Sequence, residues 1–224
     1  MPRRAGYCLA MNRDEKRARP AGLPPACRNI AGHNVVCPSE PGGGTWIALN
    51  DTGGCFALIN WYSVTDRVTH DTVSRGGIIP AVCAADNRNI VADEFARLSL
   101  DRVNPFRLIG VFPACRQITE WRWNLKKLEC VNHPWRLQQW ISSGFDEPKA
   151  QWVRGTEFRR AQGQMATGSL DWLRRLHRSH SPEAGPFSTC MHREDAATVS
   201  YTEISVLRSQ ARMCHIGTAP CRRA

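Results

Sequence analysis

Residues 42–62, GGGTWIALNDTGGCFALINWY, decide the fold class of this protein. Two runs of apolar, β-prone residues, 45–50 and 55–60, flank a turn that contains two glycines, and this order is typical of a β-hairpin. Both runs are apolar at consecutive positions, so we expect each strand to be covered on both faces. The glycines before the hairpin lack the Lys-Ser/Thr of a phosphate-binding loop, which favours a tight entry turn.

The rest of the chain alternates between strand and helix patterns, with no internal repeat and no linker. An apolar strand ends in the NRDE stretch near residue 12. We expect helices at 78–85, 89–98 and 149–161, the last preceded by the start signal of Asp146, and a further helix capped by Ser169. Further strands are expected at 106–112, 117–123, 128–131, 140–143, 188–192, 198–206 and 212–216. Residues 1–224 are therefore predicted to form a single layered α+β domain.

Composition narrows the function classes. The chain has 224 residues, of which 42% are hydrophobic, and a net charge of +10. That charge favours an anionic ligand, but the arginines are scattered among acids, so we expect no specific nucleic-acid partner. We see no segment apolar enough to span a membrane and no secretory signal. The ten cysteines are accordingly interpreted as reduced thiols of a cytoplasmic protein.

Histidines and cysteines of the C-terminal third could in principle converge on a metal. However, the chain has no CxxC pair, and no spacing matches a known zinc site. We therefore expect neither a metal nor another cofactor. The residues considered are His177, His180, Cys190, His192, Cys214 and His215.

Polar residues at two strand ends are the best candidates for a functional site. Asn12, Arg13 and Asp14 follow an apolar strand, and Asn60 ends the second strand of the predicted hairpin. An arginine beside carboxylates can hold a polar site together by charge-assisted hydrogen bonds. Strand ends also carry Asn and Asp for turn reasons, so the pattern alone leaves both interpretations open.

Several stretches together resemble the NRDE family, also called the transport and Golgi organisation 2 family, and look most like its bacterial branch. The matching stretches cover nearly the whole chain in order. They are GYCLAMNRDEKRAR, GGGTWIALNDTGGCFALINWY, SRGGIIP, NPFRLIGV, SSGFDEP, LHRSHSPEAGPFSTCMHREDAATVSYTEISV and the ending GTAPC.

The resemblance implies an N-terminal-nucleophile (Ntn) hydrolase-like fold, a four-layer α/β/β/α sandwich of two antiparallel sheets. Such hydrolases cleave amides with a first-residue cysteine, whose own α-amine accepts the thiol proton. By resemblance, Arg13 and Asp14 orient that amine and Asn60 binds the oxyanion. Asn12 is a further catalytic candidate. Trp46, Ser142 and Ser143 are implied to bind substrate.

The start of the chain departs from the family pattern. Family members begin Met-Cys, whereas Pro2 follows Met1 here and Cys8 lies within the NRDE strand. We therefore expect the first strand and the nucleophile to be lacking, which leaves the chain catalytically incompetent as it stands. Either the natural start lies upstream, in which case the full-length form is expected to hydrolyse an amide, or the protein is genuinely truncated and non-catalytic. The alternative is a non-enzymatic binding or trafficking protein for an anionic amphipathic ligand such as a lipid, acyl-CoA or haem.

Overall fold

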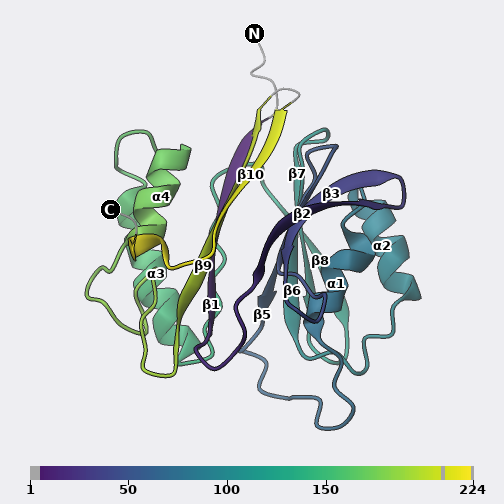
Figure 1. Ribbon diagram of the computed structural model, residues 1–224, viewed down its shortest axis with the longest axis horizontal. Helices are drawn as coiled ribbons and strands as arrows, with labels where there is room; N and C mark the ends of the chain where they lie inside the picture. Colours follow the sequence, from purple (N-terminus) through teal and green to yellow (C-terminus); the bar gives the residue numbers. More distant parts are fainter. Residues whose placement is uncertain (1–5, 208–209, 223–224) are drawn as a thin grey trace.

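The protein folds into four layers, two of helices and two of antiparallel sheet (Figure 1). The computed structural model describes residues 6–207 and 210–222. One helical pair covers a three-stranded sheet, which faces a seven-stranded sheet covered by the second helical pair. The expected α+β class and the α/β/β/α order of the layers are confirmed.

Each sheet has a simple strand order. The smaller sheet runs β1-β9-β10, and the larger one runs β2 to β8 in sequence order, with every neighbouring pair antiparallel. The strands are β1 Tyr7–Lys16, β2 Leu23–Ile30, β3 His33–Ser39, β4 Ile47–Asn50, β5 Cys55–Asn60, β6 Phe106–Phe112, β7 Gln117–Trp123, β8 Leu128–His133, β9 Ala196–Leu207 and β10 Gln210–Ile216.

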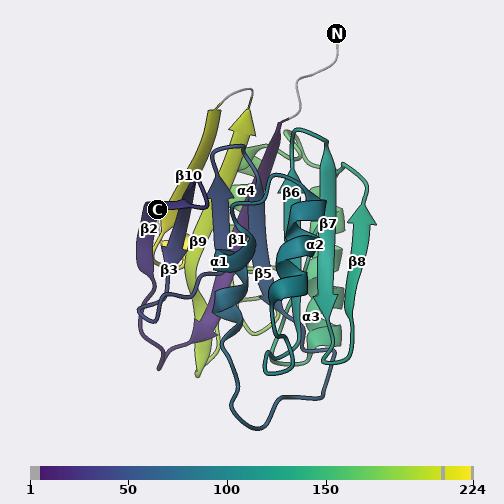
Figure 2. The same cartoon turned by 90° about the vertical axis from the view of Figure 1, so that its right-hand side faces the viewer.

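Two helical pairs form the outer layers. Helices α1 and α2 lie over the larger sheet (Figure 2), and α3 and α4 lie over the smaller one. The helices are α1 Ile78–Val82, α2 Arg88–Arg97, α3 Glu147–Ala161 and α4 Leu170–Arg178, with short 3-10 turns η1 Arg75–Gly77 and η2 Pro220–Arg222. None of the helices in the described ranges is long and apolar enough to cross a membrane.

The predicted hairpin is present as β4 and β5. Asn50 closes it, because its Oδ1 accepts a hydrogen bond from the Gly54 amide at 2.7 Å. The same side chain donates through Nδ2 to the Cys83 and Ala85 carbonyls, which fixes the turn against the end of α1. Gly53 has a φ of 80°, a conformation that favours glycine.

Both faces of this hairpin are buried, as its sequence predicts. Ile47 and Cys55 are fully buried between the two sheets, where they pack with Ile204 of β9. Phe56 is fully buried on the opposite face, in a cluster that includes Ile79 of α1. Complete burial of such a side chain contributes about 1.5–3 kcal/mol, so the hairpin anchors two hydrophobic cores at once.

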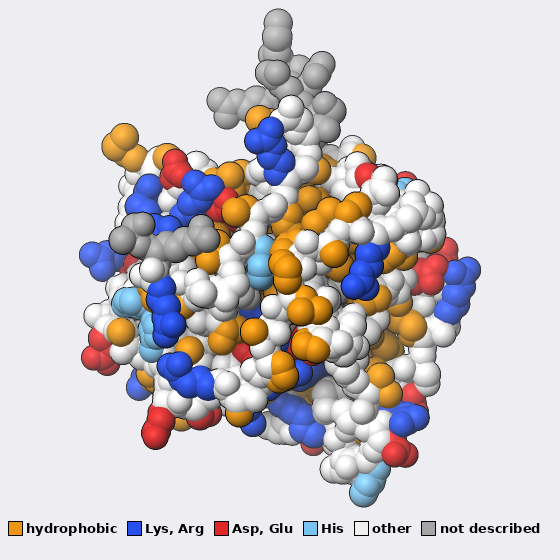
Figure 3. All heavy atoms as spheres, viewed as in Figure 1, with side chains coloured by type: hydrophobic (Ala, Val, Ile, Leu, Met, Phe, Trp, Pro, Cys, Tyr) orange, Lys and Arg blue, Asp and Glu red, His pale blue; other side chains and the backbone are white. Residues whose placement is uncertain are grey.

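The apolar layer between the sheets reaches the surface on one side of the molecule. Figure 3, drawn from the same direction as Figure 1, shows apolar side chains gathered over the middle of this face, with Lys and Arg side chains spread around them. The sandwich is therefore less completely covered here than under its helices.

Strand β1 lies at the edge of the smaller sheet, and within the described ranges it pairs only with β9. Its side chains alternate between the faces: Leu9 and Met11 pack between the sheets, whereas Ala10 packs against the α3–α4 layer. Arg13 pairs with Ser200 of β9, but Asp14 pairs with Thr198. Val199 is therefore an extra residue, and β9 carries a bulge there.

Two strand predictions are wrong. Residues 140–143 form no strand but lead into α3, and the Ser143 Oγ donates to the Phe145 carbonyl at 2.7 Å. Residues 188–192 form a turn in which Ser188 Oγ donates to the Cys190 carbonyl, with only an isolated bridge from His192. Conversely, the β2–β3 hairpin was not predicted, because its first strand is largely exposed and contains two prolines.

Candidate functional site

Consecutive residues of β1 point to opposite faces of the smaller sheet. Arg13 faces the larger sheet and stacks on Trp46, with its guanidinium carbon 4.4 Å from the ring centre. Asp14 faces the helical layer and accepts a hydrogen bond from Arg154 of α3. The two residues that the sequence singles out therefore belong to two different environments, separated by the sheet itself.

Arg13 is held in a small charged network. It is 7% exposed, and its Nη2 lies 2.7 Å from Glu40 Oε1 and 3.2 Å from Glu15 Oε2. Arg19 reaches the same two carboxylates from the solvent side, at 3.0 and 3.1 Å. Two arginines thus share two glutamates, and the aromatic face of Trp46 supports the inner one.

This network borders a pocket of about 160 Å³ lined by β1, β9, β10 and the loop after β1. Its lining includes Arg13, Lys16, Arg17 and Arg19, together with Ser200 and His215. The Ser200 Oγ is buried and has no hydrogen-bond partner among the described residues. Burial, with the nearby charge of Arg13, lowers the pKa of His215, so this ring is neutral at pH 7.

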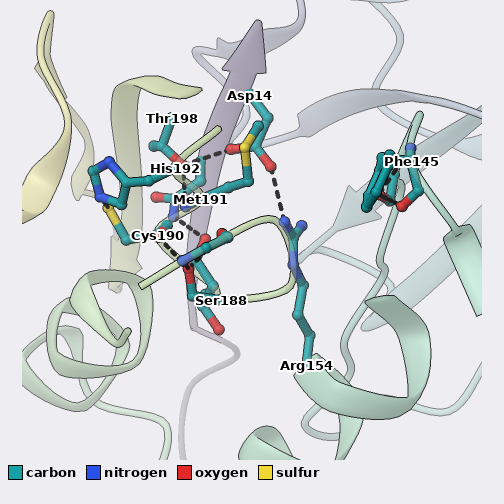
Figure 4. A network of polar contacts seen from close by, with 12 residues as sticks. Asp14, Phe145, Arg154, Ser188, Cys190, Met191, His192 and Thr198 are labelled. Carbon is teal, nitrogen blue, oxygen red and sulfur yellow. Dashed lines mark hydrogen bonds and ion pairs between the residues drawn. The ribbon is translucent and has the colours of Figure 1, made fainter. Parts of the chain in front are cut away.

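On the other face of β1, Asp14 joins three elements (Figure 4). Its Oδ2 accepts from Arg154 Nη2 at 3.2 Å, and its Oδ1 accepts from Thr198 Oγ1 at 2.6 Å. Thr198 Oγ1 in turn accepts from the Met191 amide at 2.8 Å. The carboxylate thus connects β1 to α3, and through Thr198 to the turn before β9.

The side-chain amide of Asn12 hydrogen-bonds to two backbone carbonyls on the helical side of the smaller sheet. Its Nδ2 donates to the His177 carbonyl at 3.0 Å and to the Thr189 carbonyl at 2.8 Å. Its Oδ1 is buried without a partner in the described part of the chain, as are His177 Nδ1, Thr189 Oγ1 and Arg154 Nε. Four buried polar atoms therefore gather here, so this region is a polar interior rather than an apolar core.

His177 has the most perturbed imidazole of this region. The residue keeps some surface exposure, but burial of the ring, together with the charge of Arg154, lowers its pKa to about 4. Its ring centre lies 5.5 Å from that of Tyr201. The side chain is therefore neutral at physiological pH and able to hydrogen-bond without carrying charge.

The remaining predicted residues gather at the start of α3. Asn60 ends β5, and its Nδ2 donates to Tyr62 Oη at 2.8 Å. The Tyr62 ring packs against Gly144, where an added Cβ would lie 3.2 Å from it. Ser143 donates its amide to Glu147 Oε1 at 3.4 Å. Ser142, immediately before it, is partly buried.

Asn60 lies at the same end of the sandwich as the polar end of β1. The Tyr7 hydroxyl donates to the Gly53 carbonyl at 2.8 Å, so β1 and β5 begin side by side in the facing sheets and run in the same direction. Their ends point downward in Figure 1. However, no hydrogen bond joins Asn60 to Arg13 or Asp14 within the ranges the structure describes.

Sequence reasoning missed several polar partners. Arg154, Thr198 and Ser200 come into the site only through pairing and packing over long sequence separations. Glu120 is fully buried with Arg107, Arg122 and His133 around it. The sequence did contain a signal for the group around Glu120, because charged residues alternate with tryptophans along β7.

The fold and the site together define a four-layer α/β/β/α protein with a buried, aromatic-stacked arginine at the polar end of an edge strand. The chain belongs to the family Transport and Golgi organisation 2, whose family model matches residues 3–146. The resemblance to the NRDE family is thereby confirmed. The match includes Arg13, Trp46 and Asn60 and ends before α3.

Two solved structures are similar to this chain. A structure of penicillin V acylase from Agrobacterium tumefaciens has 12% sequence identity and a TM-score of 0.48, over 94% of this chain and 82% of that one. A single-residue variant of conjugated bile acid hydrolase from Clostridium perfringens has 10% identity and a TM-score of 0.41, over 95% and 84% of the two chains. No curated protein matches the sequence significantly.

Proposed function

We propose that this protein binds a small anionic ligand in the pocket bordered by Arg13, Ser200 and His215. The observation that carries the proposal is the buried Ser200 hydroxyl without a partner among the described residues, in a pocket that also exposes part of a nearly buried arginine. Leaving a buried donor unpaired costs about 1–3 kcal/mol, and a ligand oxygen would remove that cost.

The charges around the pocket support an anion. Its lining contains the four cations Arg13, Lys16, Arg17 and Arg19, against the single carboxylate of Glu15. Glu40, which pairs with two of these arginines, still leaves an excess of positive charge. A carboxylate or phosphate group can therefore replace solvent here through charge-assisted hydrogen bonds.

The apolar lining supports an amphipathic ligand rather than a free inorganic anion. Pro20, Ala21 and Val199 border the same pocket as the cations. An acyl chain or a flat ring system can lie against such apolar side chains while its anionic group meets the cations. A fatty acid, an acyl-CoA and haem share this combination of an anionic and an apolar part.

The test is a binding titration of the full chain with a fatty acid, an acyl-CoA and haem, with inorganic phosphate for comparison. Arg13→Met and Lys16→Ala remove lining cations, and Arg97→Ala, on exposed α2, is the matched control. We expect Arg13→Met to weaken binding about tenfold to a hundredfold, since a hydrogen bond to a charged group contributes about 1.5–3 kcal/mol. Equal affinity of the Arg13 and Arg97 variants would refute the proposal.

A second candidate function is hydrolysis of a carbon–nitrogen amide by an N-terminal cysteine. It is supported by the succession of Arg13 and Asp14 on a strand whose second edge is unpaired in the described ranges. In that reaction the thiol attacks the carbonyl carbon and its proton passes to the free α-amine, which returns it to the amine product as the C–N bond breaks; water then hydrolyses the acyl-thioester that remains. Here the Asp14 carboxylate is already engaged by Arg154 and Thr198.

An amide and thioester panel distinguishes the two candidates. We expect ligand binding without turnover, because Asp14, which the resemblance assigns to orienting the amine, is already engaged by Arg154 and Thr198. The informative variant is Cys8→Ala, on β1 itself. If the parent turns over substrate and Cys8→Ala does not, hydrolysis becomes the better-supported function. If Cys8→Ala still turns over substrate, Cys8 is not the nucleophile.

A further inference from the structure

Four potential metal ligands converge near the C-terminal end of the described chain. His180 follows α4, Cys190 and His192 lie in the turn before β9, and Cys221 lies in η2. Cys190 is fully buried, and the other three are partly buried. Figure 4 shows Cys190 and His192 close to the Asp14 network, on the helical side of the sheet.

The four ligand atoms lie within 4.8 Å of one another. The Nε2 atoms of His180 and His192 are 3.0 Å apart, and His192 Nε2 lies 3.7 Å from Cys190 Sγ and 3.5 Å from Cys221 Sγ. A tetrahedral Zn²⁺ site, with Zn–N near 2.0–2.1 Å and Zn–S near 2.3 Å, requires N–N and N–S separations of about 3.3 and 3.5 Å. The observed separations are within a few tenths of an ångström of these values.

Hydrogen bonds alone do not account for this convergence. Three groups, the other imidazole and two thiols, lie within reach of the single Nε2 of His192. That nitrogen has either one proton to donate or one lone pair to share, so it can satisfy only one of the three. A cation at the centre of the four atoms would satisfy all of them together.

We propose that His180, Cys190, His192 and Cys221 bind a Zn²⁺ ion in a closed tetrahedral site. Four protein ligands leave no position for water or substrate, so the ion is structural rather than catalytic. Two thiolates would balance its charge. The site would clamp η2 to the turn before β9, and this role is independent of the ligand pocket on the opposite face of β1.

The backbone around the quartet is ordered in a way that suits a metal clamp. The Cys190 amide donates to the Ser179 carbonyl at 3.0 Å, and the His192 amide donates to the Gly185 carbonyl at 3.0 Å. These bonds hold two ligands in place before an ion binds, which lowers the entropy lost on binding. Ligands from three separate segments also explain why no linear zinc motif is present.

The test is metal analysis of the full chain, purified under reducing conditions with added zinc and then freed of loose metal. We expect one Zn²⁺ per chain, and the visible spectrum of tetrahedral, thiolate-bound cobalt after exchange with Co²⁺. Cys221→Ser and His180→Asn should each weaken binding about tenfold or more. Cys214→Ser, at an exposed cysteine of β10 outside the quartet, is the matched control and should bind as the parent does.

Cys221 and His180 are only partly buried, so their variants should fold, and circular dichroism will show it. Equal zinc content in Cys221→Ser and Cys214→Ser, or no zinc in the folded, reduced parent, would overturn the proposal. A disulfide between Cys190 and Cys221 in freshly purified protein, detected by mass spectrometry without reductant, would overturn it as well.

Discussion

Arg154 of α3 donates to Asp14 of β1 across 3.2 Å, although the two residues are 140 positions apart in the sequence. Both side chains are largely shielded, at 10% and 23% exposure. An ion pair of this kind costs much more to break than a surface pair, because the partner left behind remains buried with its charge. The Asp14 carboxylate, which the family resemblance assigns to catalysis, therefore also links the smaller sheet to the helical layer of α3 and α4.

Asp14→Asn is expected to lower the free energy of unfolding by about 2 kcal/mol, between the values for surface and fully buried pairs. Asp171→Asn is the matched control, since that carboxylate pairs with Arg174 but is 74% exposed, and we expect little change from it. Urea unfolding of both variants measures the difference. Equal stabilities would mean that the Asp14–Arg154 pair contributes nothing beyond a surface contact.

The neutral imidazole of His177 should make the fold sensitive to mild acid. Because its pKa is about 4 in the folded protein and near 6.5 when unfolded, the unfolded chain binds the extra proton first. Stability from this group is complete above pH 6.5 and is lost as the pH falls toward 4, by about 3 kcal/mol in total.

Unfolding free energies between pH 7 and pH 4 measure this effect. His177→Phe keeps a ring beside Tyr201 but cannot be protonated, so its profile should be flatter than that of the parent. His70→Phe, at an exposed position, is the control and should follow the parent. If the parent and the His177 variant lose stability in parallel, His177 is not the titrating group.

Glu120 should be the most stabilising carboxylate of the larger sheet. It is fully buried, with Arg107 Nε at 2.5 Å, Arg122 Nη2 at 2.7 Å and His133 Nε2 at 2.8 Å. Burial raises its pKa, but the hydrogen bond from Arg122 and the charge of Arg107 outweigh burial and lower it to about 2. Its stabilisation is present above the unfolded pKa near 4.5 and is lost as the pH falls toward 2.

Glu120→Gln is therefore expected to destabilise the protein by about 3–5 kcal/mol at pH 7, since three cationic or polar partners lose their anion. Glu129→Gln, on neighbouring β8, is the control, because Glu129 pairs with Lys127 at the surface. Thermal melts compare the two. If the Glu120 variant is as stable as the Glu129 variant, the free energy gained from the three partners of Glu120 only offsets the cost of burying its charge.

The sequence predicts strands β4 to β8 of the larger sheet well because their signals are local. The strands 106–112 and 117–123 match β6 and β7 to the residue, and the hairpin of β4 and β5 follows from two apolar runs and one turn. Each of these depends on residues within about ten positions of one another, and such local patterns are what sequence periodicity can detect.

The candidate site was less predictable because its partners are distant. Arg13 and Asp14 are consecutive, and the two-residue period of a strand already implies that they face opposite sides. Which groups they meet depends on the pairing of β1 with β9 and on the packing of α3, and neither leaves a local pattern. The same holds for the His180–Cys221 cluster, whose members meet only once three separate segments are folded together.

Gly22 gives the last prediction, because its backbone passes closer to Trp46 than any side chain would allow. An added Cβ would lie 2.7 Å from Trp46 Cη2. In Gly22→Ala the indole must shift, and the guanidinium of Arg13, stacked 4.4 Å from that ring, must shift with it. Overpacking of this kind costs about 1–3 kcal/mol, and we also expect weaker binding of the anionic ligand.

Gly42→Ala is the matched control, since nothing lies within 4 Å of its added Cβ. Urea unfolding and ligand titration of both variants test the link between Trp46 and the pocket, and a Gly22 variant with the stability and affinity of the Gly42 variant would break it.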